Sequence, residues 1–147
     1  MLNLRESTMT DNKMEYTTNI RVRYADTDKM GFVYNGKYLE YFEVGRAELM
    51  RSYGLPYLAF EQAGYFLPLI ESHVNYRSPA HYDDLIQLQA IYIPEISATV
   101  KFNYNAYVND KLVATGYTVH SFMNAKTGNP TKPPAFFIDS LKKLKLI

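Results

Sequence analysis

The chain of 147 residues contains no cysteine. Disulfide bonds, thiolate nucleophiles and cysteine-ligated metal sites are therefore excluded, and we expect a cytoplasmic protein. No apolar run approaches the length that spans a bilayer, and residues 1–13 lack the apolar core of a signal peptide. We accordingly expect no membrane span.

The chain also lacks a surplus of charge of either sign. Its 16 basic and 15 acidic residues give a formal net charge of +1 at pH 7. The basic residues are scattered except at Lys142, Lys143 and Lys145, where they would complement the dipole of a terminal helix. Without a basic patch there is no electrostatic case for a nucleic acid as a partner.

Several motifs of catalytic and cofactor-binding sites are missing. There is no Gly-x-Ser-x-Gly elbow, no His-Glu-x-x-His pair, no phosphate-binding loop and no dinucleotide fingerprint. No pair of histidines has the spacing of metal ligands on a helix or hairpin. The histidines are His73, His81 and His120. We therefore expect neither a metal nor a cofactor.

One short motif, Asp26-x-Asp28-x-x-Gly31, resembles the start of a calcium loop of the EF-hand kind. That loop needs an oxygen ligand at its fifth position and a glutamate at its twelfth. Met30 and Lys37 occupy those two positions here. Calcium binding by this loop is therefore excluded.

The composition is that of a folded chain, because 47% of the residues are hydrophobic. The length suits one domain with a substantial core. We expect a flexible tail at residues 1–14 and a single domain at residues 15–147.

Hydrophobic periodicity predicts the order of the secondary structure. Apolar residues alternate with mostly polar ones at 97–108, as in a half-buried strand, and recur at spacings of three and four at 35–53, as in a helix. The predicted elements are a strand at 17–24, a long helix at 35–53, a short helix at 56–63, strands at 66–76, 84–93, 97–108 and 112–124, and a terminal helix at 136–144.

This order predicts an α+β fold with one curved antiparallel sheet wrapped around a long central helix. The apolar face of the helix and the apolar face of the sheet must bury each other. Strands as long as the one expected at 112–124 twist strongly, which favours curvature around the helix. Such a sheet has edge strands, and pairing with another subunit would protect them.

The stretch 23–35 is the strongest candidate for a functional site. It runs from the end of a strand through two aspartates, Asp26 and Asp28, and a glycine to the start of the long helix. Amides at a helix N-terminus are unpaired, and the helix dipole is positive there. A carboxylate beside such donors suits acyl transfer, because one group attacks or activates water while the others stabilise an oxyanion. Asp-x-Asp is also common at the end of a strand, where it caps a turn.

Three segments resemble hotdog-fold acyl-CoA thioesterases of the 4-hydroxybenzoyl-CoA thioesterase type. They are Tyr24-Ala25-Asp26-Thr27-Asp28-Lys29-Met30-Gly31-Phe32-Val33-Tyr34-Asn35-Gly36-Lys37-Tyr38, then Tyr41-Phe42-Glu43 with Arg46 and Glu48, and Tyr76-Arg77-Ser78-Pro79-Ala80-His81-Tyr82-Asp83-Asp84. The resemblance extends from about residue 16 to residue 134.

By this resemblance Asp28 is the catalytic residue, as nucleophile or as general base. The backbone amides of about Tyr34 and Asn35 would polarise the carbonyl of an acyl-CoA or acyl carrier protein thioester. Gly31 would permit a close backbone approach or simply form a turn, and Tyr38 would line the acyl pocket or pack in the core. The resemblance also implies a homodimer or a dimer of dimers, that is, a homotetramer.

Two other functions stay open at this point. A non-catalytic hotdog domain that binds acyl-CoA would keep the pocket, although it would not need an acid at Asp28. A hotdog hydratase or dehydratase would pair a histidine with a carboxylate near the helix. No histidine lies between Asp28 and Tyr53, so this alternative ranks below the thioesterase.

Overall fold

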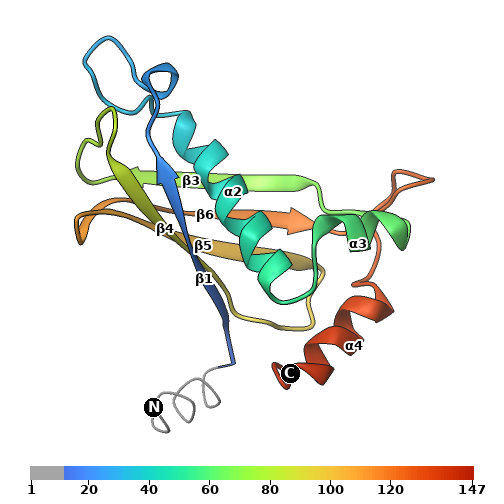
Figure 1. Cartoon of the computed structure of the whole chain (residues 1–147). Helices are drawn as coiled ribbons and strands as arrows, with labels where there is room; N and C mark the ends of the chain where they lie inside the picture. The colour runs from blue at the N-terminus through green and yellow to red at the C-terminus, as the bar shows by residue number, and fades with distance from the viewer. Residues whose placement is uncertain (1–11) are drawn as a thin grey trace, which may run out of the picture.

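The computed structural model describes residues 12–147 (Figure 1). Its elements are β1 (Met14–Arg21), the 3-10 helix η1 (Tyr24–Asp26), α2 (Lys37–Ser52), α3 (Tyr57–Gln62), β2 (Tyr65–Phe66), β3 (Leu69–Tyr76), β4 (Leu85–Tyr92), β5 (Thr99–Val108), β6 (Lys111–Ser121), β7 (Met123–Asn124) and α4 (Ala135–Lys143). Residues 1–11 of the tail expected at 1–14 lie outside this description, and β1 already begins at the buried Met14.

Five of the strands form one antiparallel sheet in the order β1-β4-β5-β6-β3. The sheet curves, and α2 lies against one of its faces (Figure 1). This arrangement confirms the predicted α+β fold, with a curved antiparallel sheet around a long central helix. The strands β1 and β3 are the two edges of the sheet.

The core lies between α2 and the sheet, where the predicted apolar faces of the helix and the strands pack together. Alternate residues of β5 are buried, including Phe102 and Tyr104, while the apolar side of α2 buries Phe42 and Leu49. The ring of Phe42 stacks on that of Tyr104 with centroids 4.2 Å apart. The alternation of the strand and the three-to-four spacing of the helix therefore bury the same interface.

Two glycines let α2 approach the sheet closely. A Cβ atom at Gly45 would lie 2.5 Å from Cδ2 of Leu88 in β4, and one at Gly116 would lie 2.5 Å from Cε2 of Phe42. The Gly116 position is also closed by the backbone carbonyl of His73. At these two points the distance between helix and sheet leaves no room for a methyl group.

Three of the predicted strands have different bounds in the structure. The first strand ends at Arg21, and Tyr24 lies in η1, where it is 73% exposed and its ring stacks on that of Tyr82. The strand predicted at 66–76 is interrupted near Pro68, which has no N–H to donate to a ladder. The strand predicted at 112–124 is likewise divided at Phe122, and the end pieces β2 and β7 pair with each other.

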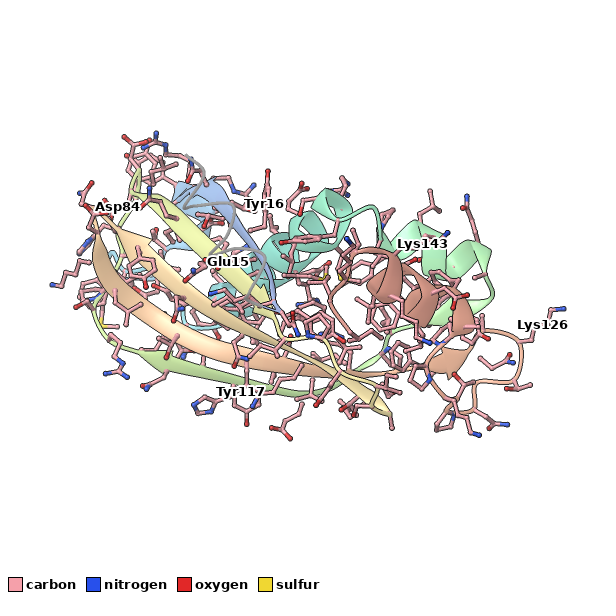
Figure 2. The ribbon with its side chains drawn as sticks, turned by 90° about the horizontal axis from the view of Figure 1, so that it is seen from below. Glu15, Tyr16, Asp84, Tyr117, Lys126 and Lys143 are labelled. Carbon is pink, nitrogen blue, oxygen red and sulfur yellow. The ribbon has the colours of Figure 1, made fainter. Side chains whose placement is uncertain are left out.

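The edge strand β3 is exposed along most of its length. One side pairs with β6, and the other side has no strand partner among residues 12–147. Leu69 and Ile70 are 49% and 57% exposed there. Figure 2 shows Tyr117 of β6 on the outer face of the sheet, which is turned away from α2.

Candidate active site

A cavity of about 430 Å³ lies where the loop before α2 meets the end of β3. Its walls combine one carboxylate, one guanidinium and several aromatic and apolar side chains. They are formed by Asp28, Met30, Phe32, Val33, Tyr34, Asn35, Tyr38, Tyr76, Arg77, Ser78 and Pro79. The predicted residues Asp28, Tyr34, Asn35 and Tyr38 therefore come together at one cavity.

The carboxylate of Asp28 is held by its own loop. Oδ1 accepts hydrogen bonds from the backbone amides of Met30, at 3.0 Å, and Phe32, at 3.2 Å. The Asp28 backbone N–H donates to the carbonyl of Phe32 at 2.8 Å, which closes the loop. Oδ2 accepts no hydrogen bond from residues 12–147. The side chain is thus oriented through one oxygen, and the other is left for a ligand.

Asp26 has a different environment, since the residue is only 2% exposed. Its carboxylate accepts hydrogen bonds from the hydroxyl of Tyr41 (2.9 Å), the Arg23 backbone amide (3.1 Å) and the Arg23 guanidinium (3.2 Å), and lies 3.4 Å from Nζ of Lys37. Burial alone would raise the pKa of Asp26, but the hydrogen bonds from Arg23 and Tyr41 outweigh it and hold the pKa below its ordinary value. Asp26 thus ties the Asp28 loop to α2 and lies outside the cavity wall.

The helix begins two residues later than predicted, at Lys37, with Gly36 at its N-cap. The Tyr34 amide, predicted to polarise the substrate carbonyl, donates instead to the backbone carbonyl of Asp26 at 2.8 Å. The Asn35 amide makes no hydrogen bond within the described part of the chain. Of the two predicted donors, only Asn35 therefore has a free N–H, while Tyr34 contributes its side chain to the cavity.

The sequence left two interpretations open for Gly31, a close backbone approach or a turn, and two for Tyr38, the acyl pocket or the core. Gly31 has φ +81°, and a Cβ atom added to it would meet no atom within 4 Å, so the loop needs its backbone conformation rather than a close approach. It does not line the cavity. Tyr38 does both things expected of it: it lines the cavity, and its ring packs edge-on against those of Tyr41 and Tyr76. Burial raises the pKa of Tyr38 to about 12, so its phenol is protonated at neutral pH.

The opposite wall of the cavity is formed by residues 76–79. The hydroxyl of Tyr76, at the end of β3, donates to the carbonyl of Asn35 at 2.9 Å and so joins β3 to the start of α2. Arg77 is the only basic residue among those lining the cavity. These residues lie about fifty positions after Asp28, so the signal for this wall was the resemblance of segment 76–84 to the thioesterase family.

Within residues 12–147, no three histidine or carboxylate side chains gather closely enough to hold a metal ion. In the same part of the chain, no helix has both the length and the apolar character needed for a membrane crossing.

Comparison with known proteins adds independent information. The sequence model described as the Thioesterase-like superfamily matches residues 22–141. An Aquifex aeolicus protein provisionally named an esterase is 31% identical over 130 residues, which cover 88% of this chain and 99% of that protein. A Bacillus subtilis protein provisionally named an acyl-CoA thioesterase is 42% identical over 65 residues, or 44% of this chain and 47% of that protein.

Among solved structures, the DHNA-CoA thioesterase of Staphylococcus aureus superimposes with a TM-score of 0.81 and 26% identity. The match covers 89% of this chain and 91% of that one. The segment matched by the family includes every residue that lines the cavity beside Asp28.

Proposed function

The chain belongs to the thioesterase-like superfamily and is a thioester hydrolase with a hotdog fold, and we propose that it hydrolyses acyl-CoA thioesters in the cavity beside Asp28. Relatives named acyl-CoA thioesterase and DHNA-CoA thioesterase support CoA as the thiol carrier. An acyl carrier protein thioester is the alternative carrier. We place the reaction in the cytoplasm, as expected from the sequence.

One observation carries this proposal. Asp28 has a carboxylate oxygen without a hydrogen-bond donor, and it shares a cavity wall with Asn35, whose amide has no acceptor within residues 12–147. A thioester carbonyl placed between the two would meet an attacking or water-activating oxygen and a donor for the developing oxyanion. No group in the site other than these two is required for the first step, because a thiolate is a good leaving group.

Asp28 acts in one of two ways. As a nucleophile, Oδ2 attacks the carbonyl carbon, the carbon–sulfur bond breaks, the CoA thiolate leaves, and water then hydrolyses the acyl-aspartyl anhydride. As a general base, Oδ2 takes a proton from a water molecule as its oxygen attacks the same carbon. The carbon–sulfur bond then breaks, and the CoA thiolate leaves and takes up a proton. In both cases the two amides on Oδ1 hold the carboxylate in place, and the Asn35 amide faces the oxyanion.

The cavity favours an acyl group with apolar character. Phe32, Tyr34, Tyr38 and Tyr76 supply aromatic surface. Its volume of about 430 Å³ lies within the usual range of small-molecule sites. Gly31 acts indirectly in this proposal, through the turn that brings the Met30 and Phe32 amides to Asp28.

Thiol release from a panel of aromatic, short-chain and long-chain acyl-CoAs tests the proposal. The protein contributes no thiol of its own to a thiol-reactive dye assay, because it has no cysteine. Asp28→Asn should lower kcat by about a hundredfold or more, as expected when a positioned acid–base or nucleophilic group is lost. Asp139→Asn on the exposed side of α4 is the matched control and should leave kcat unchanged.

Two outcomes would count against the proposal. If the wild type binds acyl-CoA but releases no thiol, thioester hydrolysis at this site is wrong. If Asp28→Asn keeps full activity, Asp28 is not the catalytic residue. Intact-protein mass spectrometry under single-turnover conditions separates the two mechanisms, since only the nucleophilic one adds the acyl mass to the chain.

We also propose that the enzyme is at least a homodimer formed through β3, and that two dimers associate into a homotetramer. The free edge of β3 carries the exposed Leu69 and Ile70, and an unpaired edge of this kind is a template for another strand. A two-fold axis would pair β3 with its own copy in antiparallel orientation. Light scattering should give at least twice the chain mass of 17.0 kDa, and a monomer at micromolar concentration would refute the dimer.

A further inference from the structure

A second cavity, of about 260 Å³, lies beside the middle of α2. It is lined by residues of α2, α3, β2, β6 and the segment that joins β2 to β3, and none of them belongs to the cavity beside Asp28. Its walls include Arg46, Tyr57, Phe60, Tyr65, Leu67 and His120. A guanidinium thus lies among aromatic and apolar side chains.

The guanidinium of Arg46 has no anionic partner. Its Nε donates to the hydroxyl of Tyr57 at 2.9 Å, and the nearby hydroxyl of Tyr104 also interacts with it. Both partners are neutral phenols, and no carboxylate of residues 12–147 lies within 4 Å of the guanidinium. A guanidinium has five N–H donors, and these two hydroxyls use only part of them. Arg46 is half-buried, and its remaining N–H donors suit an anion as a further partner.

The residues hydrogen-bonded in series from Tyr104 to His120 do not supply an anion for Arg46. The Tyr104 hydroxyl lies 2.6 Å from Oγ1 of Thr118, which lies 3.0 Å from Nε2 of His120. Nδ1 of His120 lies 3.3 Å from the carbonyl of Leu67, so this nitrogen carries the proton and Nε2 accepts. Burial, together with the nearby Arg46 charge, lowers the pKa of His120 to about 4. The side chains of Tyr104, Thr118 and His120 are therefore all neutral at physiological pH, and none of them balances the charge of Arg46.

We propose that this second cavity binds the carboxylate of a small organic acid, with Arg46 as its charge partner. A carboxylate matches the planar fork of a guanidinium, and the bonds formed are charge-assisted. Tyr65, Phe60 and Leu67 would contact the hydrocarbon part.

The lining also contains the exposed Glu43 and Glu61, which repel a multiply charged anion. A monocarboxylate is therefore favoured over inorganic phosphate.

An NMR titration of the full ¹⁵N-labelled chain tests this proposal without any turnover. The probes are benzoate and hexanoate, each compared with its uncharged amide, benzamide or hexanamide. Both carboxylates should shift backbone amide signals of Tyr65, Leu67 and His120, and the uncharged amides should not. Arg46→Met should weaken the binding at least about tenfold, which corresponds to about 1.4 kcal/mol. Arg51→Met, which removes an exposed arginine of the same helix, should leave it unchanged.

Several results would overturn the proposal. These are the absence of shifts around the cavity at about 10 mM carboxylate, equal shifts with the uncharged amides, or binding of inorganic phosphate without binding of the carboxylates. An unchanged affinity of Arg46→Met for the carboxylates would also overturn it. Should that variant fail to fold, the map of shifted signals in the wild type decides, because shifts confined to the loop around Asp28 would place the ligand in the other cavity.

Discussion

The bond between Tyr41 and Asp26 gives the sharpest prediction for stability. Tyr41→Phe removes one hydroxyl from α2 and keeps the ring that packs against Tyr38. The buried Asp26 carboxylate then loses a donor at 2.9 Å and keeps Arg23 and Lys37. Because Asp26 ties the Asp28 loop to α2, the substitution should both destabilise the fold and loosen the site.

The magnitude follows from the charge of the acceptor. Hydrogen bonds to charged groups contribute about 1.5–3 kcal/mol, more than bonds between neutral groups. Asp26 retains three of its four partners, so we expect a loss near the lower end, about 2 kcal/mol. With a urea m-value of about 2 kcal/mol/M, the unfolding midpoint should fall by about 1 M.

The loss should depend on pH in one direction. The folded-state pKa of Asp26 lies below its ordinary value, so its ionised form contributes stability above about pH 4, and that contribution disappears as the pH falls through the folded-state pKa. Tyr41 donates to the ionised carboxylate. The difference in unfolding free energy between wild type and Tyr41→Phe should therefore be largest at neutral pH and shrink in acid.

Urea unfolding of both proteins at pH 7 and at about pH 3 measures these differences. Tyr16→Phe is the control, because Tyr16 is 41% exposed in β1 and its hydroxyl makes no hydrogen bond to residues 12–147. If Tyr41→Phe unfolds at the wild-type urea concentration, or if its deficit grows in acid, the reasoning about Asp26 is wrong.

Three further predictions concern other parts of the structure. Arg77→Gln should raise KM for acyl-CoA severalfold without changing kcat, and leave KM unchanged for a short thioester without the nucleotide, because Arg77 is the only cation among the residues that line the cavity beside Asp28. Gly116→Ala should lower stability by about 1–3 kcal/mol in thermal unfolding, because its methyl group would collide with Phe42 and the His73 carbonyl. His120→Gln should reduce the loss of stability on acidification from about pH 6.5 towards pH 4, where the unfolded chain protonates this histidine and the folded chain, with its pKa of about 4, does not.

The central helix and β5 could be predicted because each buries only one face. Apolar residues therefore recur at regular intervals along the sequence of each element. Phe102 and Tyr104 occupy alternate positions, and both are buried as predicted. Asp28 could be singled out because the loop and the start of the helix follow it directly. These features depend on neighbours within a few residues.

Features that depend on distant contacts could not be predicted in the same way. The Tyr34 amide was expected to be unpaired because it lies near the start of a helix, but it donates a hydrogen bond to the carbonyl of Asp26. Tyr76 reaches Asn35 across 41 positions, and no local pattern marks that pair. The second cavity has the same origin: Arg46 meets Tyr57 and Tyr104 only after α3 and β5 have packed against α2.

The two glycine contacts between α2 and the sheet have a consequence for engineering this enzyme. Gly45 and Gly116 fix how α2 sits on β4 and β6, and neither lines the cavity beside Asp28. Met30 and Ser78 line that cavity at positions outside this contact. A library aimed at new acyl groups can therefore vary Met30 and Ser78 while Gly45 and Gly116 are held constant, so that selectivity changes without displacing α2.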